Sequence, residues 1–308
     1  MDRPCENELK KYKVLIKSDN AFTSNARLWQ SKWREENKIP IGMYRGIEIG
    51  SLINYDYAFA HMANFISEHT KDFIRMELPR LETTPVFDTN RFLTNLLSSQ
   101  PLCFNLFCEL KKQLNIATII FQKLLQNVDI NEIIKIDYEY SPGRGNIKFT
   151  KDNTAFDVFI EYFQSNGKKC FLGIEVKYTE TLNEDKQEKI IKYDKERYKE
   201  LTIKSGMFKN ISTENFKKPQ LWQIWRDHLL SISMLKESEV LYEYERGYFI
   251  YLYPSQNTQC NEGIKMYKKY LKDNHNVLEI HLENIIKEIK NKIDEEWVSN
   301  LSKRYIGE

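Results

Sequence analysis

Residues 154–180, TAFDVFIEYFQSNGKKCFLGIEVKYTE, constrain the fold of this chain more than any other stretch. Two apolar segments of strand length flank the polar residues 165–167, Ser-Asn-Gly, and the second segment covers residues 170–176. A three-residue hairpin loop commonly closes on a glycine in the left-handed region, and Gly167 has that position. The pattern therefore predicts a β-hairpin whose loop is residues 165–167.

The loop sets the pairing of the two strands. If residues 165–167 form it, Gln164 pairs with Lys168, and counting outward places Asp157 directly opposite Glu175. Opposite residues share one face of a sheet, with Cβ atoms about 4.5–5.5 Å apart. Lys177 follows Glu175 by two positions, so it points to the same face.

Two facing carboxylates among Phe, Val, Ile and Leu repel each other. Such a pair is costly unless one group is protonated or a cation lies between them. A divalent ion with oxygen ligands fits, because Mg²⁺ commonly takes one or two carboxylates together with water and substrate phosphate. A lysine beside them could hold or help to deprotonate a water. This combination suits metal-assisted hydrolysis of a phosphodiester.

Asp157 on one strand and Glu175-Val176-Lys177 on the next resemble the motif of the PD-(D/E)XK nuclease superfamily, which has the restriction-endonuclease-like fold. The position before Asp157 is Phe156, where the motif has a proline that shapes the turn and binds no metal. Further stretches resemble a group of restriction-endonuclease-like bacterial proteins, and together they cover Ala26 to Leu235: ARLWQSKWREENKIPIG from Ala26, NLLSSQPLCFNLF from Asn95, EYSPGR from Glu139 and QLWQIWRDHLLSISML from Gln220.

The resemblance implies roles for these residues. Asp157, Glu175 and the backbone carbonyl of Val176 would bind Mg²⁺, with Mn²⁺ as a substitute, and Lys177 would position the attacking water. Glu139, just before SPGR, is the preferred additional acidic residue, and Glu109 on an earlier helix is another. The alternatives, an edge-strand charge at Glu139 and a solvated glutamate at Glu109, stay open.

Three further residues are candidates for contact with substrate phosphate. Gln223 and Arg226 lie three positions apart on a predicted helix, 220–236, and by analogy with the superfamily a polar residue on a helix after the hairpin faces the site. Arg144 lies on the polar connection before the hairpin. A guanidinium suits phosphate because it donates two hydrogen bonds. For Arg226 a surface salt bridge is the alternative.

The whole pattern predicts an α/β protein with a central mixed sheet of four to five strands flanked by helices. Beside the hairpin, strands are expected at 133–140, 248–253 and 277–282. Helices are expected within 1–38, at 55–72, within 89–125, and at 183–204, 220–236 and 284–305, with a loop at 78–88. We expect residues 1–88 to form a helical N-terminal extension and residues 89–308 to form the nuclease-like domain.

Composition excludes some classes of protein. The longest apolar runs fall short of the ~20 residues that cross a membrane, and the N-terminal residues lack the apolar segment of a signal peptide. Five scattered cysteines are typical of reduced thiols in a cytoplasm. The net charge of +2 requires any nucleic-acid surface to come from a local cluster.

These observations predict a cytoplasmic, Mg²⁺-dependent endonuclease that acts on nucleic acid, DNA rather than RNA. The resemblance implies use in restriction or phage defence, and dimers are common in the superfamily. Two alternatives stay open. One is a nucleic-acid-binding module without catalysis, and the other is a nuclease subunit of a larger defence complex that cuts only with its partner.

Overall fold

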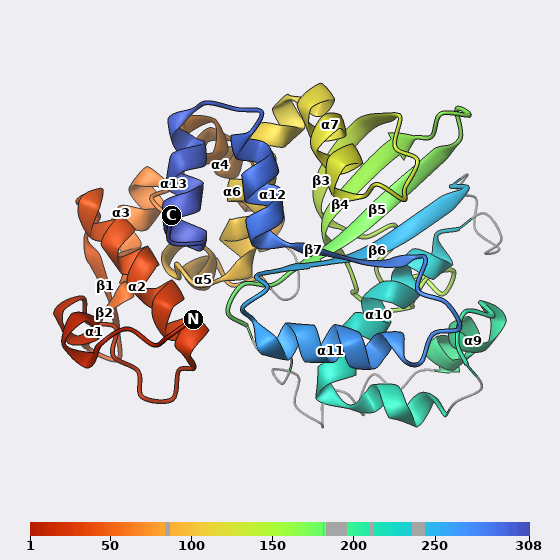
Figure 1. The fold of residues 1–308 in the computed structure, drawn as a ribbon, viewed down its shortest axis with the longest axis horizontal. Helices are drawn as coiled ribbons and strands as arrows, with labels where there is room; N and C mark the ends of the chain where they lie inside the picture. Colours follow the sequence, from red (N-terminus) through yellow and green to blue (C-terminus); the bar gives the residue numbers. More distant parts are fainter. Residues whose placement is uncertain (84–86, 181, 183–195, 210–211, 236–243) are drawn as a thin grey trace. The chain divides into compact units, whose positions relative to one another are not determined.

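The computed structural model of the 308-residue chain describes residues 1–83, 87–180, 182, 196–209, 212–235 and 244–308 (Figure 1). Contacts divide the chain into two compact units: residues 1–113 with 282–308, and residues 114–281. The boundary expected from the sequence, at 88/89, differs from this division because residues 89–113 and the C-terminal residues pack with the N-terminal part. The assignment of residues 1–88 as a helical extension and 89–308 as the nuclease-like domain stays a prediction.

The second unit is built on a five-stranded mixed sheet in the order β3-β4-β5-β6-β7. β3, β4 and β5 are antiparallel, whereas β6 runs parallel to both β5 and β7. The predicted mixed sheet is confirmed, and its strands are β3 (Glu132–Tyr140), β4 (Phe156–Phe163), β5 (Lys169–Val176), β6 (Arg246–Tyr253) and β7 (Val277–His281).

Helices cover the sheet of the second unit. α10 (Pro219–Ser233) packs against β5 and β6, next to α11 (Thr258–Lys268) (Figure 1). Trp222 and Trp225 of α10 join Phe249 of β6 in one buried cluster. The sheet is thus apolar beneath α10. Residues 247–253 of β6 are all buried, as expected for a continuous apolar strand that is covered on both faces. The described residues of this unit also form α7 (Leu114–Leu124), α9 (Glu196–Lys204) and the short η1 (Thr213–Lys217).

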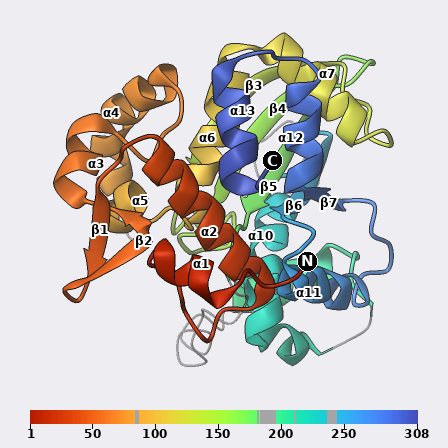
Figure 2. The same cartoon turned by 60° about the vertical axis from the view of Figure 1, so that its left-hand side comes forward.

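The first unit combines helices from both ends of the chain with a two-stranded sheet. β1 (Ile41–Tyr44) and β2 (Ile47–Ile53) form a hairpin between α2 and α3 (Figure 2). α13 packs along α2. The helices are α1 (Glu6–Lys11), α2 (Ala21–Glu36), α3 (Tyr55–His61), α4 (Glu68–Glu82), α5 (Thr89–Thr94), α6 (Ser99–Lys112), α12 (Leu282–Lys290) and α13 (Glu296–Tyr305).

Several expectations for the first unit were wrong. The loop expected at 78–88 begins inside α4, which continues to Glu82 with Pro79 in its interior. A proline inside a helix costs about 3 kcal/mol. Leu78 and Leu81 are nearly fully buried, and burial of such a side chain contributes about 1.5–3 kcal/mol. Tertiary packing therefore outweighs the local cost.

Other boundaries also differ. The helix expected at 55–72 is two helices, because Met62 adopts a left-handed conformation (φ 49°) and Ser67 caps a new start. The closing helix expected at 284–305 is likewise divided into α12 and α13, and the β1–β2 hairpin was not expected.

Parts of two predicted helices lie outside the described residues. For the helix expected at 183–204, α9 covers Glu196–Lys204, and residues 183–195 are not described. For the helix expected at 220–236, α10 ends at Ser233, and residue 236 is not described. In the described parts of the chain, no helix combines the length and apolarity that a membrane span requires.

Candidate active site

The β4–β5 hairpin has the predicted register. Gly167 has φ +77°, and the Gln164 amide donates to the Lys168 carbonyl at 2.9 Å. The ladder then runs from Phe163↔Lys169 to Val158↔Ile174. The next position outward places Asp157 opposite Glu175, as the count from the loop predicts.

A buried network surrounds the two carboxylates. Asp157 Oδ2 accepts a 2.7 Å hydrogen bond from the Val176 amide. Glu175 Oε1 accepts from Gln223 Nε2 at 2.5 Å and lies 2.8 Å from Lys177 Nζ. Glu175 is 4% exposed and Lys177 9%. Among the described residues, no donor reaches Asp157 Oδ1 or Glu175 Oε2, so each carboxylate keeps one oxygen for another ligand.

The charges of this cluster affect one another. Burial, Glu175 and Glu139 raise the pKa of Asp157 well above its usual value, against the effects of Lys177 and the Val176 amide. Burial alone would lower the pKa of the Lys177 ammonium, but Glu175, Asp157 and Glu180 outweigh it and raise the pKa. Lys177 is therefore a firmly protonated donor in this state, which suits positioning a water rather than removing its proton.

Glu139 lies on the strand beside Asp157. Its position falls between the pairs Tyr138↔Val158 and Tyr140↔Phe156, and its backbone is left-handed (φ 47°). Its carboxylate contributes to the raised pKa of Asp157. The three neighbouring strands β3, β4 and β5 thus place Glu139, Asp157 and Glu175 at about the same level of the sheet.

The other sequence-predicted residues have different surroundings. Arg144 donates to the Asn153 carbonyl at 2.9 Å, and its guanidinium lies 3.9 Å from Glu139. Arg226 donates to Thr154 Oγ1 at 3.0 Å, and its Nε lies 3.6 Å from the buried carboxylate of Asp152, so this ion pair is not at the surface. Glu109 is a buried residue of α6 in the first unit. Gln223 is the one of these residues that bonds Glu175 directly.

Asp227 is a carboxylate that the sequence analysis did not select. It lies on α10, four residues after Gln223, and it is 3% exposed. Its Oδ2 has no hydrogen-bond partner among the described residues. Burial and then Glu175 raise the pKa of Asp227 well above its usual value. The i, i+4 spacing from Gln223 is the signal that could have identified it, since such residues share a helix face.

A protein-family comparison covers nearly the whole chain. The family model described as PD-(D/E)XK nuclease superfamily matches residues 17–307. The chain belongs to the PD-(D/E)XK nuclease superfamily. Its five-stranded mixed sheet flanked by helices is consistent with the restriction-endonuclease-like fold. No curated protein and no solved structure matches the chain.

PD-(D/E)XK proteins are usually nucleases that bind nucleic acid and typically use divalent metals. Within the described residues, no three His, Cys, Asp or Glu side chains gather closely enough to hold a metal by themselves. A hard cation needs fewer, because Mg²⁺ is bound through one or two carboxylates and keeps several waters. The paired carboxylates of Asp157 and Glu175, each with one oxygen that accepts no hydrogen bond, fit such an ion.

Proposed function

We propose that this chain is a Mg²⁺-dependent endonuclease that hydrolyses phosphodiester bonds of DNA, with Asp157, Glu175 and Lys177 as its catalytic residues. The single observation that carries the proposal is the convergence of these side chains at the end of the hairpin: the Val176 amide donates to Asp157 Oδ2 at 2.7 Å, and Lys177 Nζ lies 2.8 Å from Glu175 Oε1. The raised pKa of Asp157 supports it, because a cation between the carboxylates would relieve their repulsion.

In this proposal the carboxylates of Asp157 and Glu175 and the carbonyl of Val176 would hold the ion. The ion would supply Lewis-acid polarisation of the scissile phosphate and would acidify a nearby water. Lys177 keeps its proton and donates a hydrogen bond to the attacking water, which it orients toward phosphorus. Gln223 fixes the Glu175 carboxylate from α10, and Glu139 supplies further negative charge beside Asp157.

Arg226 and Arg144 are proposed phosphate contacts of lower rank, because both guanidinium groups already bind protein oxygens. Arg226 would need to exchange its contact with Asp152 for a substrate phosphate. Glu109 is retained as a proposed additional acidic residue, on α6. A role in restriction or phage defence, and cleavage as a homodimer, rest on the resemblance alone.

The decisive experiment incubates the purified chain with plasmid, linear duplex DNA, single-stranded DNA and RNA, in Mg²⁺, Mn²⁺ or chelator. We expect cleavage of DNA only with the divalent ion. Asp157→Asn and Glu175→Gln should abolish it, and Lys177→Met should slow it by about 100-fold or more, the usual loss when one transition-state donor is removed.

A matched control lies on the same hairpin. Glu161 is buried, lies 2.9 Å from Lys169, and accepts a hydrogen bond from Tyr244, so it repeats the glutamate–lysine pair away from Asp157. The Glu161→Gln variant should cleave DNA at the rate of the parent chain. Full activity of folded Asp157→Asn would refute the site.

If the parent chain cleaves none of these substrates, calorimetric titration of Mn²⁺ distinguishes the two alternative functions. Binding that Asp157→Asn loses would indicate a nuclease that needs a partner, and absence of binding would indicate an inactive nucleic-acid-binding module.

A further inference from the structure

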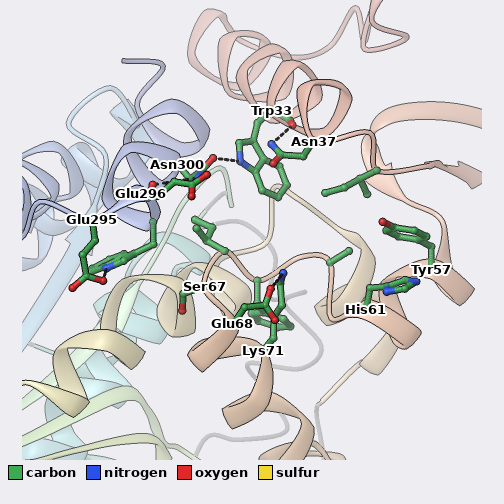
Figure 3. A pocket seen from close by; sticks show the side chains of 15 residues that line it. Trp33, Asn37, Tyr57, His61, Ser67, Glu68, Lys71, Glu295, Glu296 and Asn300 are labelled. Atoms are coloured by element: carbon green, nitrogen blue, oxygen red, sulfur yellow. Dashed lines mark hydrogen bonds and ion pairs between the residues drawn. The ribbon is translucent and has the colours of Figure 1, made fainter.

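The first unit contains a pocket of ≈ 460 Å³ (Figure 3). Small-ligand sites usually measure about 300–1,000 Å³, so the volume is sufficient for one. Three stretches line it: residues 33–39 at the end of α2, residues 57–71 from α3 to the start of α4, and residues 295–300 at the start of α13. All of them belong to the unit that lacks Asp157 and Glu175.

Aromatic side chains form much of the wall. Trp33 and Trp297 are each 5% exposed, and the rings of Tyr57 and His61 lie 4.4 Å apart, centroid to centroid. The indole of Trp33 is held in place, because the buried guanidinium of Arg304 lies 4.1 Å from its ring centroid. Because the indoles are nearly buried, the more exposed rings of Tyr57 and His61 are the main aromatic surfaces that the pocket offers to a cation.

The indole and amide donors of the lining are already used within the protein. Trp33 Nε1 donates to Asn300 Oδ1 at 2.9 Å, and Trp297 Nε1 donates to Glu295 Oε2 at 3.1 Å. Asn37 Nδ2 donates to the Trp33 carbonyl at 2.8 Å, and Asn300 Nδ2 donates to the Glu296 carbonyl at 3.2 Å. A ligand would thus find mainly acceptors on these residues.

The donors near the start of α4 are used in the same way. Lys71 Nζ lies 2.7 Å from Glu68 Oε1 (Figure 3), and Ser67 Oγ donates to Thr70 Oγ1 at 2.8 Å. Tyr57 and His61 keep groups that can donate or accept. An anionic ligand would meet few donors here, although the pocket adjoins the start of a helix.

The formal charge of the pocket is negative. Its lining contains three carboxylates, Glu68, Glu295 and Glu296, and, among the described lining residues, Lys71 as the one ammonium. Lys71 forms an ion pair with Glu68, so no ammonium group of the described lining neutralises the negative charges of Glu295 and Glu296. Glu296 is exposed, and no described residue donates to its carboxylate.

We propose that this pocket binds a guanidinium group, either that of a free alkylguanidine or that of an arginine side chain in a peptide. A guanidinium is planar, carries five N–H donors and stacks on aromatic rings. It therefore matches a pocket with aromatic walls, excess acceptors and negative charge. The proposal is independent of the proposed nuclease function and concerns a site in the other unit.

Isothermal titration calorimetry of the full-length chain tests the proposal with three ligands: agmatine, an acetylated Gly-Arg-Gly amide, and the same peptide with citrulline in place of arginine. Citrulline keeps the planar shape and lacks the charge. We expect agmatine, the arginine peptide or both to bind, and the citrulline peptide to show no measurable heat. Binding by agmatine alone would indicate a small-molecule site, and binding by the peptide would indicate a partner's arginine.

Two variants decide whether the binding occurs in this pocket. Glu296→Gln should weaken binding about fivefold, the effect of losing one partly solvated ion pair. Glu36→Gln is the matched control, because Glu36 is an exposed glutamate of α2 that does not line the pocket, and its affinity should stay unchanged. The proposal is overturned if neither cation binds, if citrulline binds equally well, or if Glu296→Gln retains the parent affinity.

Discussion

Asp152 and Asp227 are two buried carboxyl groups of the second unit with opposite surroundings. Asp152 lies 3.6 Å from Arg226 and accepts hydrogen bonds from Thr150, Thr154 and Tyr198. Burial raises its pKa, but Arg226 and these bonds outweigh burial and lower it. Asp227 has no such donors among the described residues, and burial and Glu175 raise its pKa well above 3.8.

Substitution of Asp227 by asparagine should therefore stabilise the chain. An unpaired charge costs more to bury than an uncharged amide of the same shape, so Asp227→Asn should raise the free energy of unfolding by about 1 kcal/mol at pH 7 in chelator. Denaturant unfolding of parent and variant measures it. Because the folded pKa is raised, the parent loses stability as pH rises from the unfolded pKa through the folded one. The difference in the free energy of unfolding between Asp227→Asn and the parent should accordingly be absent near pH 3 and should grow as pH increases.

Asp152→Asn is the control with the opposite sign. Folding lowers the pKa of Asp152 in the parent chain. The contribution of Asp152 to stability is therefore present above the unfolded pKa and is lost as pH falls through the folded pKa. The variant should unfold more easily at pH 7, by about 1–3 kcal/mol. Equal effects of the two substitutions at pH 7 would contradict the assigned surroundings.

The β4–β5 hairpin brings the proposed catalytic residues together, and its turn depends on Gly167. An added Cβ there meets no atom within 4 Å, so the cost of a side chain comes from the backbone alone, at φ +77°. Gly173 in β5 presents the contrasting case, because its added Cβ would lie 2.5 Å from the ring of Phe156.

Gly167→Ala should destabilise the chain by about 1 kcal/mol, the cost of a left-handed conformation for an L-residue. Gly167→Asn should cost less, because asparagine tolerates this conformation. Thermal unfolding followed by circular dichroism gives both values. Gly173→Ala should cost about 1–3 kcal/mol through overpacking. A neutral Gly167→Ala would show that the loop does not require the left-handed residue.

The two ends of the chain meet in the first unit. Arg304 of α13 is fully buried and donates to Gln30 and to the carbonyl and side chain of Asn64. Trp33 of α2 donates to Asn300. The five-stranded sheet and its aromatic cluster, in contrast, lie entirely within residues 114–281.

A chain truncated after Glu295 should therefore lose order in one unit and keep it in the other. We expect amide hydrogen exchange to accelerate in α2 and in residues 55–82, because the truncation leaves the buried acceptors of Gln30 and Asn64 unpaired. Protection in β3 to β7 should persist. Mass spectrometry of peptides after exchange resolves the two regions. Simultaneous loss of protection in the sheet would show that the chain unfolds as one cooperative body.

Short-range patterns in the sequence were enough to predict the strands of the sheet and the register of the hairpin. Alternation and apolar runs identify β3, β6 and β7, and the loop 165–167 sets the pairing because side chains in a strand repeat every two residues. For that reason Asp157 and Glu175 could be paired from residue numbers alone. The family match over residues 17–307 confirms the superfamily that the motif predicted.

Tertiary structure alone decided the features that depend on distant parts of the chain. Pro79 lies inside a helix because α4 buries Leu78 and Leu81. The raised pKa of Asp227 arises from burial and from Glu175, which is 52 positions earlier in the numbering. The pocket of the first unit needs α2 and α13, which begin at residues 21 and 296. Burial and long-range contacts have no local sequence pattern, because they depend on how the helices pack.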